Sequence, residues 1–196
     1  PWIDWIHTAL VQGNLVRDFV KWDDQPMGVE AFPSSIMRGY RTAVSEPKGP
    51  VYLCFDVTDQ EAVLEREIPI PDPARFRPAA PLQAERDAIK EVARLLSEAQ
   101  TPVILADYVG RNNEAVSSLV ELAGLLALPV IDLGARLNFP NTHPLNLTGK
   151  NRELLGSADL ILGLDVVDLD GMLTYYDSAN KTSMPAIDPS CKVIHV

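Results

Sequence analysis

The chain has 196 residues, of which 46% are hydrophobic, and a formal net charge of −10 at pH 7. This length suits one domain and part of another, with ample material for a core. The acidic charge argues against nucleic acid as a partner, because phosphate binding needs a clustered basic face. No apolar run reaches the ~20 residues that span a bilayer and no signal peptide is recognisable, so the sequence predicts a cytoplasmic protein that binds no membrane.

The first 60 residues are predicted to form the closing part of an α/β domain. A short helix is expected from Gln12 to Val20. A second helix starts near Pro33, because proline suits the first helical turn. The apolar segment 51–55 is predicted as a strand, with Asp56 at its carboxyl end.

Residues 61–82 are predicted to be a linker between domains. Prolines 69, 71, 73, 78 and 81 fall within this segment. A proline cannot donate to a strand ladder or sit inside a helix. This composition is typical of an extended, semi-rigid connection.

A second α/β domain is predicted over residues 83–196. Helical spacing of apolar residues predicts a helix over 83–99, and another that Asn112 or Asn113 caps. Apolar runs without polar alternation indicate strands that are buried on both faces; they cover 102–107, 128–133 and 159–165. The last segment, 192–196, is predicted as another core strand. Such strands predict a three-layer α/β fold, in which a parallel, Rossmann-like sheet has helices on both sides. Because the chain stops on a core-like strand, we expect a fragment of a longer polypeptide.

Open α/β sheets bind ligands beyond the carboxyl ends of their strands. Asp132 ends the second strand and is a candidate to hold a ribose hydroxyl; the alternative is a carboxylate that caps a loop or faces water. Arg136 lies in the loop where a ligand phosphate would lie, or is a plain surface arginine. Asp165 ends the third strand and is the third candidate for cofactor binding. It crowds one loop with Asp168 and Asp170, but the calcium-loop pattern is missing, so no metal site is predicted.

Several common catalytic signatures are absent from the sequence. The glycine-rich dinucleotide fingerprint, the P-loop, Gly-x-Ser-x-Gly and Cys-x-x-Cys are all missing. The histidines at 7, 143 and 195 have no metal-ligand spacing, and Cys54 and Cys191 are predicted to be inert thiols rather than a disulfide or redox pair. No complete catalytic set is therefore predicted in this chain.

Several segments follow one another in a recognisable order. They are Gly49-Pro-Val-Tyr-Leu-Cys-Phe-Asp56, the proline-rich linker, Thr101-Pro-Val-Ile-Leu-Ala106, Phe139-Pro-Asn-Thr-His-Pro-Leu145, Ser157-Ala-Asp-Leu-Ile-Leu-Gly163 and Lys192-Val-Ile-His-Val196. In this order they resemble the thiamine-diphosphate-dependent enzymes of the acetolactate synthase group. The resemblance implies that residues 1–60 end a pyrimidine-binding domain and that 83–196 form most of a central domain, truncated at its carboxyl end.

The resemblance also implies the chemistry of the parent protein. It implies thiamine diphosphate and Mg²⁺ as cofactors, decarboxylation or carboligation of a 2-oxo acid, and a homodimer or homotetramer completed by the missing domains of its own chain. The glutamate that activates the cofactor would precede Pro1, and the Gly-Asp-Gly…Asn motif that holds Mg²⁺ would follow Val196. The piece alone is therefore expected to be inactive.

Two further expectations follow from the family. The segment Val16-Arg-Asp-Phe-Val-Lys-Trp22 is similar to one in acetohydroxyacid synthases whose lysine faces the substrate channel, which assigns Lys21 to that channel; a solvated lysine at a helix end is the alternative. Some members bind FAD or ADP in the central domain. Here Gly171 replaces the family's arginine, and Asp107-Tyr108 replaces a glycine-rich turn, which argues against flavin. A nucleotide-binding module without thiamine chemistry and a purely structural domain are the alternative functions.

Overall fold

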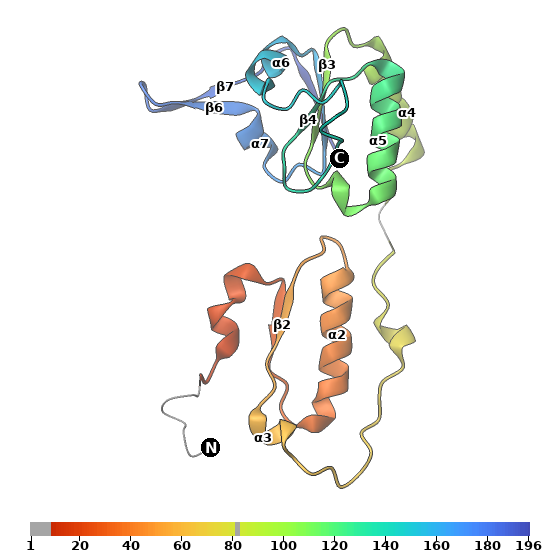
Figure 1. Ribbon diagram of the computed structural model, residues 1–196, viewed down its shortest axis with the longest axis vertical. Helices are drawn as coiled ribbons and strands as arrows, with labels where there is room; N and C mark the ends of the chain where they lie inside the picture. The colour runs from red at the N-terminus through yellow and green to blue at the C-terminus, as the bar shows by residue number, and fades with distance from the viewer. Residues whose placement is uncertain (1–8, 81–82) are drawn as a thin grey trace. The chain divides into compact units, whose positions relative to one another are not determined.

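The computed structural model describes residues 9–80 and 83–196. The chain divides into two compact units, Pro1–Gln83 and Ala84–Val196. Figure 1 shows the elements of each unit in chain order. His7 and the last two residues of the predicted linker lie outside the described residues.

The first unit contains a parallel β–α–β arrangement. Strands β1 (Trp22–Asp24) and β2 (Val51–Leu53) pair in parallel, with Trp22 opposite Val51. Helix α2 (Phe32–Val44) connects them and carries a proline in its first turn, as predicted. The predicted helix over 12–20 is instead two 3₁₀ turns, η1 (Gln12–Leu15) and η2 (Arg17–Phe19), because Gly13 and Asn14 are weak helix formers.

Three further short helical elements lie in the described part of the first unit: η3 (Val29–Ala31), α3 (Val57–Gln60) and η4 (Pro73–Phe76). Asp56 caps α3, since its carboxylate accepts a hydrogen bond from the backbone N–H of Thr58 at 2.8 Å. Turn η4 belongs to the predicted linker and contacts α2, where Tyr40 and Phe76 line a common pocket. Part of this proline-rich segment therefore packs on the first unit.

A four-stranded parallel sheet forms the centre of the second unit. Its strand order is β4–β3–β5–β8, with β3 (Pro102–Ala106), β4 (Val130–Asp132), β5 (Leu160–Leu164) and β8 (Lys192–His195). Ile104 lies opposite Val130 on one side and Leu162 on the other. The predicted apolar segments thus lie side by side in one direction, which confirms the α/β class. Strand β8 is part of the sheet, but as an edge strand it is exposed at three of its four residues, so the prediction of a core strand there is wrong about its burial.

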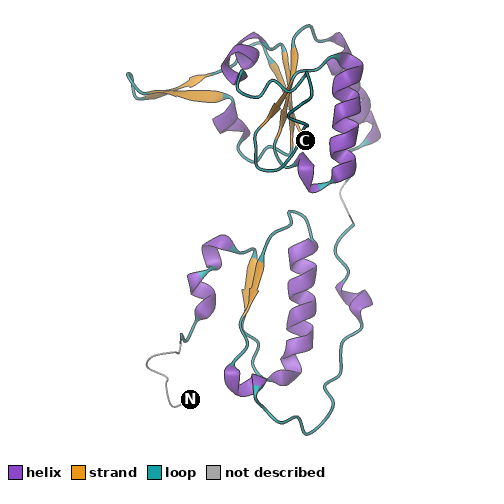
Figure 2. Ribbon diagram, in the orientation of Figure 1, coloured by secondary structure: helices purple, strands orange, loops and turns teal. Residues whose placement is uncertain are grey.

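Helices cover both faces of this sheet (Figure 2). Helices α4 (Arg86–Glu98) and α5 (Asn113–Leu126) lie on one face, and α6 (Asn151–Ser157) and α7 (Leu169–Met172) on the other. Consecutive side chains of β3 enter different cores: Ile104 packs with residues of α4 and α5, whereas Leu105 packs with residues of α6. Burial on both faces explains why polar residues are missing from the strand.

Helix α5 has defined ends. The Asn112 side chain accepts a hydrogen bond from the backbone N–H of Glu114 at 3.0 Å, so Asn112 is the cap and Asn113 is the first helical residue. The helix ends at Leu126, and its C-cap Ala127 adopts the left-handed conformation with φ 53°. None of the helices in the described part of the chain is long and apolar enough to cross a membrane.

An antiparallel hairpin projects from the second unit, made of β6 (Thr174–Asp177) and β7 (Thr182–Pro185) (Figure 1). All four side chains of β7 are exposed. The sequence did not predict this hairpin, because exposed strands leave no apolar pattern to detect.

Candidate ligand site at the carboxyl edge of the sheet

The strand order creates a switch point next to β3. The chain crosses from β3 to β4 on one side, whereas β5 lies on the other side of β3. A crevice opens beyond the carboxyl ends of strands at such a point. Here a pocket of about 500 Å³ lies among the turn η5 (Val109–Arg111), helix α5 and the end of β5.

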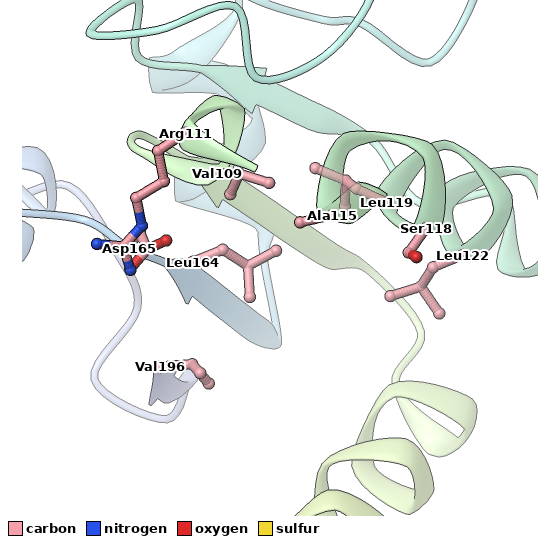
Figure 3. A pocket seen from close by; sticks show the side chains of 9 residues that line it. All are labelled: Val109, Arg111, Ala115, Ser118, Leu119, Leu122, Leu164, Asp165 and Val196. Atoms are coloured by element: carbon pink, nitrogen blue, oxygen red, sulfur yellow. The ribbon is translucent and has the colours of Figure 1, made fainter. Parts of the chain in front are cut away.

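The pocket wall is apolar and its polar groups are few (Figure 3). Leu119 and Leu122 of α5 face Leu164 of β5, and Val196 closes the wall beyond them. Arg111 is the one cation among the lining residues that the structure describes. Asp165 also lines the pocket and pairs with this cation. A ligand with an apolar body and an anionic group that shares Arg111 with Asp165 would match this combination.

Arg111 and Asp165 form an ion pair beside this wall. The Nη2 atom of Arg111 lies 2.7 Å from Oδ1 of Asp165, and the two side chains are 34% and 33% exposed. Asp165 has a left-handed backbone with φ 53°, and its N–H donates to the carbonyl of Val196 at 2.8 Å. A residue other than glycine holds this conformation only where its surroundings compensate the strain. The ion pair and the backbone bond supply that compensation.

Asp107 joins the loops that follow β3 and β5. Its side chain is only 8% exposed, and Oδ2 accepts a hydrogen bond from the N–H of Val167 at 3.2 Å. The carboxylate is thereby used to hold the two loops together. The hydrogen bond from Val167 to Asp107 therefore fixes the backbone of both loops at the mouth of the pocket.

Asp132 holds the loop that follows β4. Its carboxylate accepts hydrogen bonds from the backbone N–H groups of Gly134, Asn138 and Phe139 at 2.9, 3.2 and 3.3 Å. The Asn138 side chain adds a fourth at 2.7 Å. This is the geometry of a loop cap, and the role of Asp132 on a ribose stays a prediction.

Asn138 links this loop to the turn after β3. Its side chain is fully buried, Nδ2 also donates to the Arg136 carbonyl at 3.0 Å, and Oδ1 accepts from the N–H of Gly110 at 3.0 Å. A Cβ added at Gly110 would collide with the carbonyl oxygen of Leu137. Glycine is needed at this position because the two backbones touch.

The predicted site residues do not form one cluster. Arg136 is exposed in the loop that Asp132 holds, whereas Asp165 belongs to the pocket wall. Lys21 is in the other unit, where Nζ donates to the carbonyls of Thr42 and Ser45 at 2.9 and 2.6 Å. The phosphate role of Arg136 and the substrate-channel role of Lys21 stay predictions.

Two residues of this edge were not candidates from sequence. Arg111 carried a detectable signal, since it is a cation in the loop directly after a buried strand. Asn138 carried none, because its importance comes from burial and from a bond to a residue far away in sequence. The two cysteines are unbridged and half-buried, and burial raises the pKa of the Cys191 thiol.

The geometry of residues 9–80 and 83–196 gives no support for a metal site. No three side chains of His, Cys, Asp or Glu come together there in a group able to hold a metal. Asp168, from the acidic loop, caps α7 by accepting a hydrogen bond from the N–H of Gly171 at 2.9 Å.

Comparison with known families gives a match over most of the second unit. The thiamine pyrophosphate enzyme central-domain family matches residues 89–196. A probable acetolactate synthase large subunit of Methanocaldococcus jannaschii is 33% identical over 143 residues, which is 68% of this chain and 23% of that protein. Acetolactate synthase isozyme 1 large subunit of Escherichia coli is 27% identical over 177 residues, or 86% of this chain and 29% of that protein. The chain thus spans less than a third of the curated relatives it matches.

Solved structures show the same fold. Benzoylformate decarboxylase from Polynucleobacter necessarius superposes with a TM-score of 0.71 at 24% identity, covering 93% of this chain and 34% of that one. A thiamine diphosphate-dependent 4-hydroxybenzoylformate decarboxylase from Rhodococcus jostii gives a TM-score of 0.69 at 25% identity, with the same coverage.

Proposed function

This chain belongs to the thiamine pyrophosphate enzymes, whose central domain it carries at residues 89–196, and we propose that it is part of an enzyme that decarboxylates or carboligates 2-oxo acids. The observation that carries the proposal is the likeness to acetolactate synthase large subunits. That likeness extends over 177 residues, more than the central domain contains, so it includes residues of the first unit. It therefore supports assigning residues 1–60 to the end of a pyrimidine-binding domain.

The described residues do not fit thiamine diphosphate with Mg²⁺. Magnesium takes several oxygen ligands, and no such group forms within 9–80 and 83–196. The carboxylates at the sheet edge are already engaged, Asp107 and Asp132 by N–H groups and Asp165 by Arg111. We therefore place the activating glutamate and the Mg²⁺ motif in other domains of the parent enzyme. When bound there, thiamine diphosphate supplies the electron sink for loss of carbon dioxide.

In this proposal the second unit is a rigid support between the cofactor-binding domains. Strands β3, β4 and β5 of its sheet are buried on both faces, and such close packing resists deformation. The parent would be a cytoplasmic homodimer or homotetramer, as the family resemblance implies. Sedimentation of the full-length protein measures that assembly directly.

The test compares the full-length parent with this chain. Each is incubated with thiamine diphosphate, Mg²⁺ and pyruvate, 2-oxobutyrate or benzoylformate, and products are followed by NMR. The parent is expected to consume at least one 2-oxo acid, whereas the 196-residue chain is expected to consume none. Turnover by the chain alone would contradict the assignment of the catalytic groups to other domains, and an inert parent would contradict the enzyme.

The pocket favours a second function for the same unit, the binding of a nucleotide. It lies at the switch point where α/β folds bind nucleotides, and it combines apolar walls with Arg111. Calorimetric titration of the chain with ADP, FAD and NAD tests this. Arg111→Met should weaken binding but leave it measurable, since the apolar walls remain, while Arg152→Met should not weaken it, since Arg152 lies over the ring of Tyr175 at 4.7 Å. Failure of all three ligands to bind would reject the nucleotide function and leave the structural one.

A further inference from the structure

Asn138 makes a contact that the folding of its own loop does not require. Asp132 already holds that loop through the N–H groups of Gly134 and Phe139. The Oδ1 atom of Asn138 points out of the loop and accepts from Gly110, 28 residues earlier in the chain. This acceptor therefore serves the turn after β3.

The residue that follows Gly110 is Arg111, the cation of the pocket. Turn η5 contains three residues, so fixing the Gly110 N–H fixes the backbone from which the Arg111 side chain extends. The close approach of Gly110 to the Leu137 backbone restricts the turn from the same side. On the other side, Asp165 holds the guanidinium itself at 2.7 Å.

We propose that Asn138 is a positioning residue for ligand binding in this pocket. Its hydrogen bond to Gly110 fixes η5, so that the guanidinium of Arg111 is already positioned at the pocket in the unliganded protein. The anionic group of a ligand can then bind to this cation without rearranging the turn. A binding site that is ordered in advance loses less entropy when the ligand binds. The inference rests on the proposed nucleotide function and adds the residue that organises its cation.

The test is a double-mutant cycle in the 196-residue chain, with ADP as the probe. Asn138→Ala removes the hydrogen bond from Gly110 together with those to Asp132 and Arg136. It should weaken ADP binding about tenfold, because η5 is no longer held. In the Arg111→Met background the same change should have no further effect, because Asn138 acts through Arg111. An unchanged affinity, or an equal loss in both backgrounds, would overturn the proposal.

Asn146→Ala is the matched control. Asn146 is also a loop asparagine; it is half-buried, whereas Asn138 is fully buried, and it has two hydrogen bonds, to the Pro140 carbonyl and from the Thr148 N–H, both at 3.2 Å. Neither bond leads to η5, so this variant should lose stability and keep its affinity for ADP. If Asn138→Ala does not fold, Asn138→Leu fills the same buried space without an acceptor for the Gly110 N–H and should weaken ADP binding to a similar extent.

Hydrogen exchange separates this inference from the nucleotide function. The Gly110 amide should exchange faster in Asn138→Ala than in the original chain, and should be unchanged in Asn146→Ala. If the chain binds none of the nucleotides but Gly110 behaves in this way, the nucleotide function fails and the positioning of η5 stands. If Gly110 exchange does not respond, the positioning role is wrong whatever the chain binds.

Discussion

Lys21 is a surface lysine whose charge lies at a helix end. Its ammonium donates to the carbonyls of Thr42 and Ser45, at the carboxyl end of α2, where the helix dipole is negative. We expect Lys21→Met to lower the free energy of unfolding by about 1 kcal/mol, because two hydrogen bonds and this dipole interaction are lost. Urea unfolding followed by tryptophan fluorescence measures the change.

Lys48→Met is the control for this prediction. Lys48 is also exposed and pairs with Glu46 at 3.6 Å, and such a surface pair contributes little. Its replacement should change the unfolding free energy by less than about 0.5 kcal/mol. If the two variants are equally stable, the helix end does not depend on Lys21.

For single residues, the sequence predicts the position at the end of a strand but not the groups that the side chain contacts. Asp132 could be identified as important because it ends a buried strand, a position that pattern alone reveals. The groups it would bind could not be identified, since they depend on how the loop returns to it. Arg136 and Arg111 illustrate the same limit: both follow strands, and only the three-dimensional fold distinguishes the exposed one from the one at the pocket.

Helix α5 offers a prediction at the scale of an element. Asn112 caps it through a side-chain hydrogen bond, and Asn113 is the first residue inside. Asn112→Ala should therefore destabilise the chain by about 1 kcal/mol. Asn113→Ala should stay within about 0.5 kcal/mol of the original. Thermal unfolding of both variants tests the assignment, and the reverse order of stability would make Asn113 the cap.

Asp159 ties the start of β5 to the residues before β3. Its carboxylate accepts from the N–H groups of Gln100 and Thr101 at 2.7 and 3.0 Å. The hydrogen bond from Gln100, followed by that from Thr101, holds the pKa of Asp159 below its ordinary value. A lowered pKa contributes stability above the ordinary pKa of about 4, and this stability is lost as the pH falls through the value in the folded state.

The corresponding prediction concerns the slope of stability against pH. Between pH 6 and roughly pH 3, the unfolding free energy of Asp159→Asn should fall less steeply than that of the original chain. Thr101→Val should keep most of the original slope, since it removes the hydroxyl but leaves the backbone N–H on the carboxylate. Urea unfolding at a series of pH values gives the slopes. Identical slopes for Asp159→Asn and the original chain would exclude this contribution.

Buried elements were the easiest to predict. Strands β3, β4 and β5 and helix α5 follow from apolar spacing, because each packs into a core. Strand β2 is half-buried and β8 is exposed at three of its four residues, yet both were predicted because their segments are rich in apolar residues. Strand β1 has no such run and β7 is wholly exposed, so β1 and the hairpin β6–β7 were missed. Helix α7 is a single turn that Asp168 caps, which is too short to leave a periodic pattern.

At the scale of the molecule, the division into two units predicts the pattern of limited proteolysis. Residues 62–67 are exposed and have no regular structure, whereas η4 is held against α2. A protease of broad specificity should cut first near 62–67 or around 83–86, and leave a resistant fragment that contains 87–196. Mass spectrometry identifies the cuts. Early cleavage inside β3 or β5 would contradict a compact second unit.

The fold class was predictable because β3, β4 and β5 of the second unit obey one rule. Strands without polar residues must be covered on both faces, and helices between them must supply the cover. The family resemblance rested on the order of these same strands. The hydrogen-bonded links among the loops at the sheet edge lay beyond the sequence, because residues up to 60 positions apart meet there.

The two-sided burial of β3 has a consequence for evolution. Ile104 and Leu105 are covalent neighbours, yet each belongs to a separate hydrophobic cluster, whereas Leu105 shares its cluster with Leu155, 50 positions away. Mutations at the adjacent pair should be close to additive, while those at the distant pair should show epistasis. During evolution, substitutions can therefore change the helices on one face of the sheet, together with the strand residues that pack against them. The helices on the opposite face need not change.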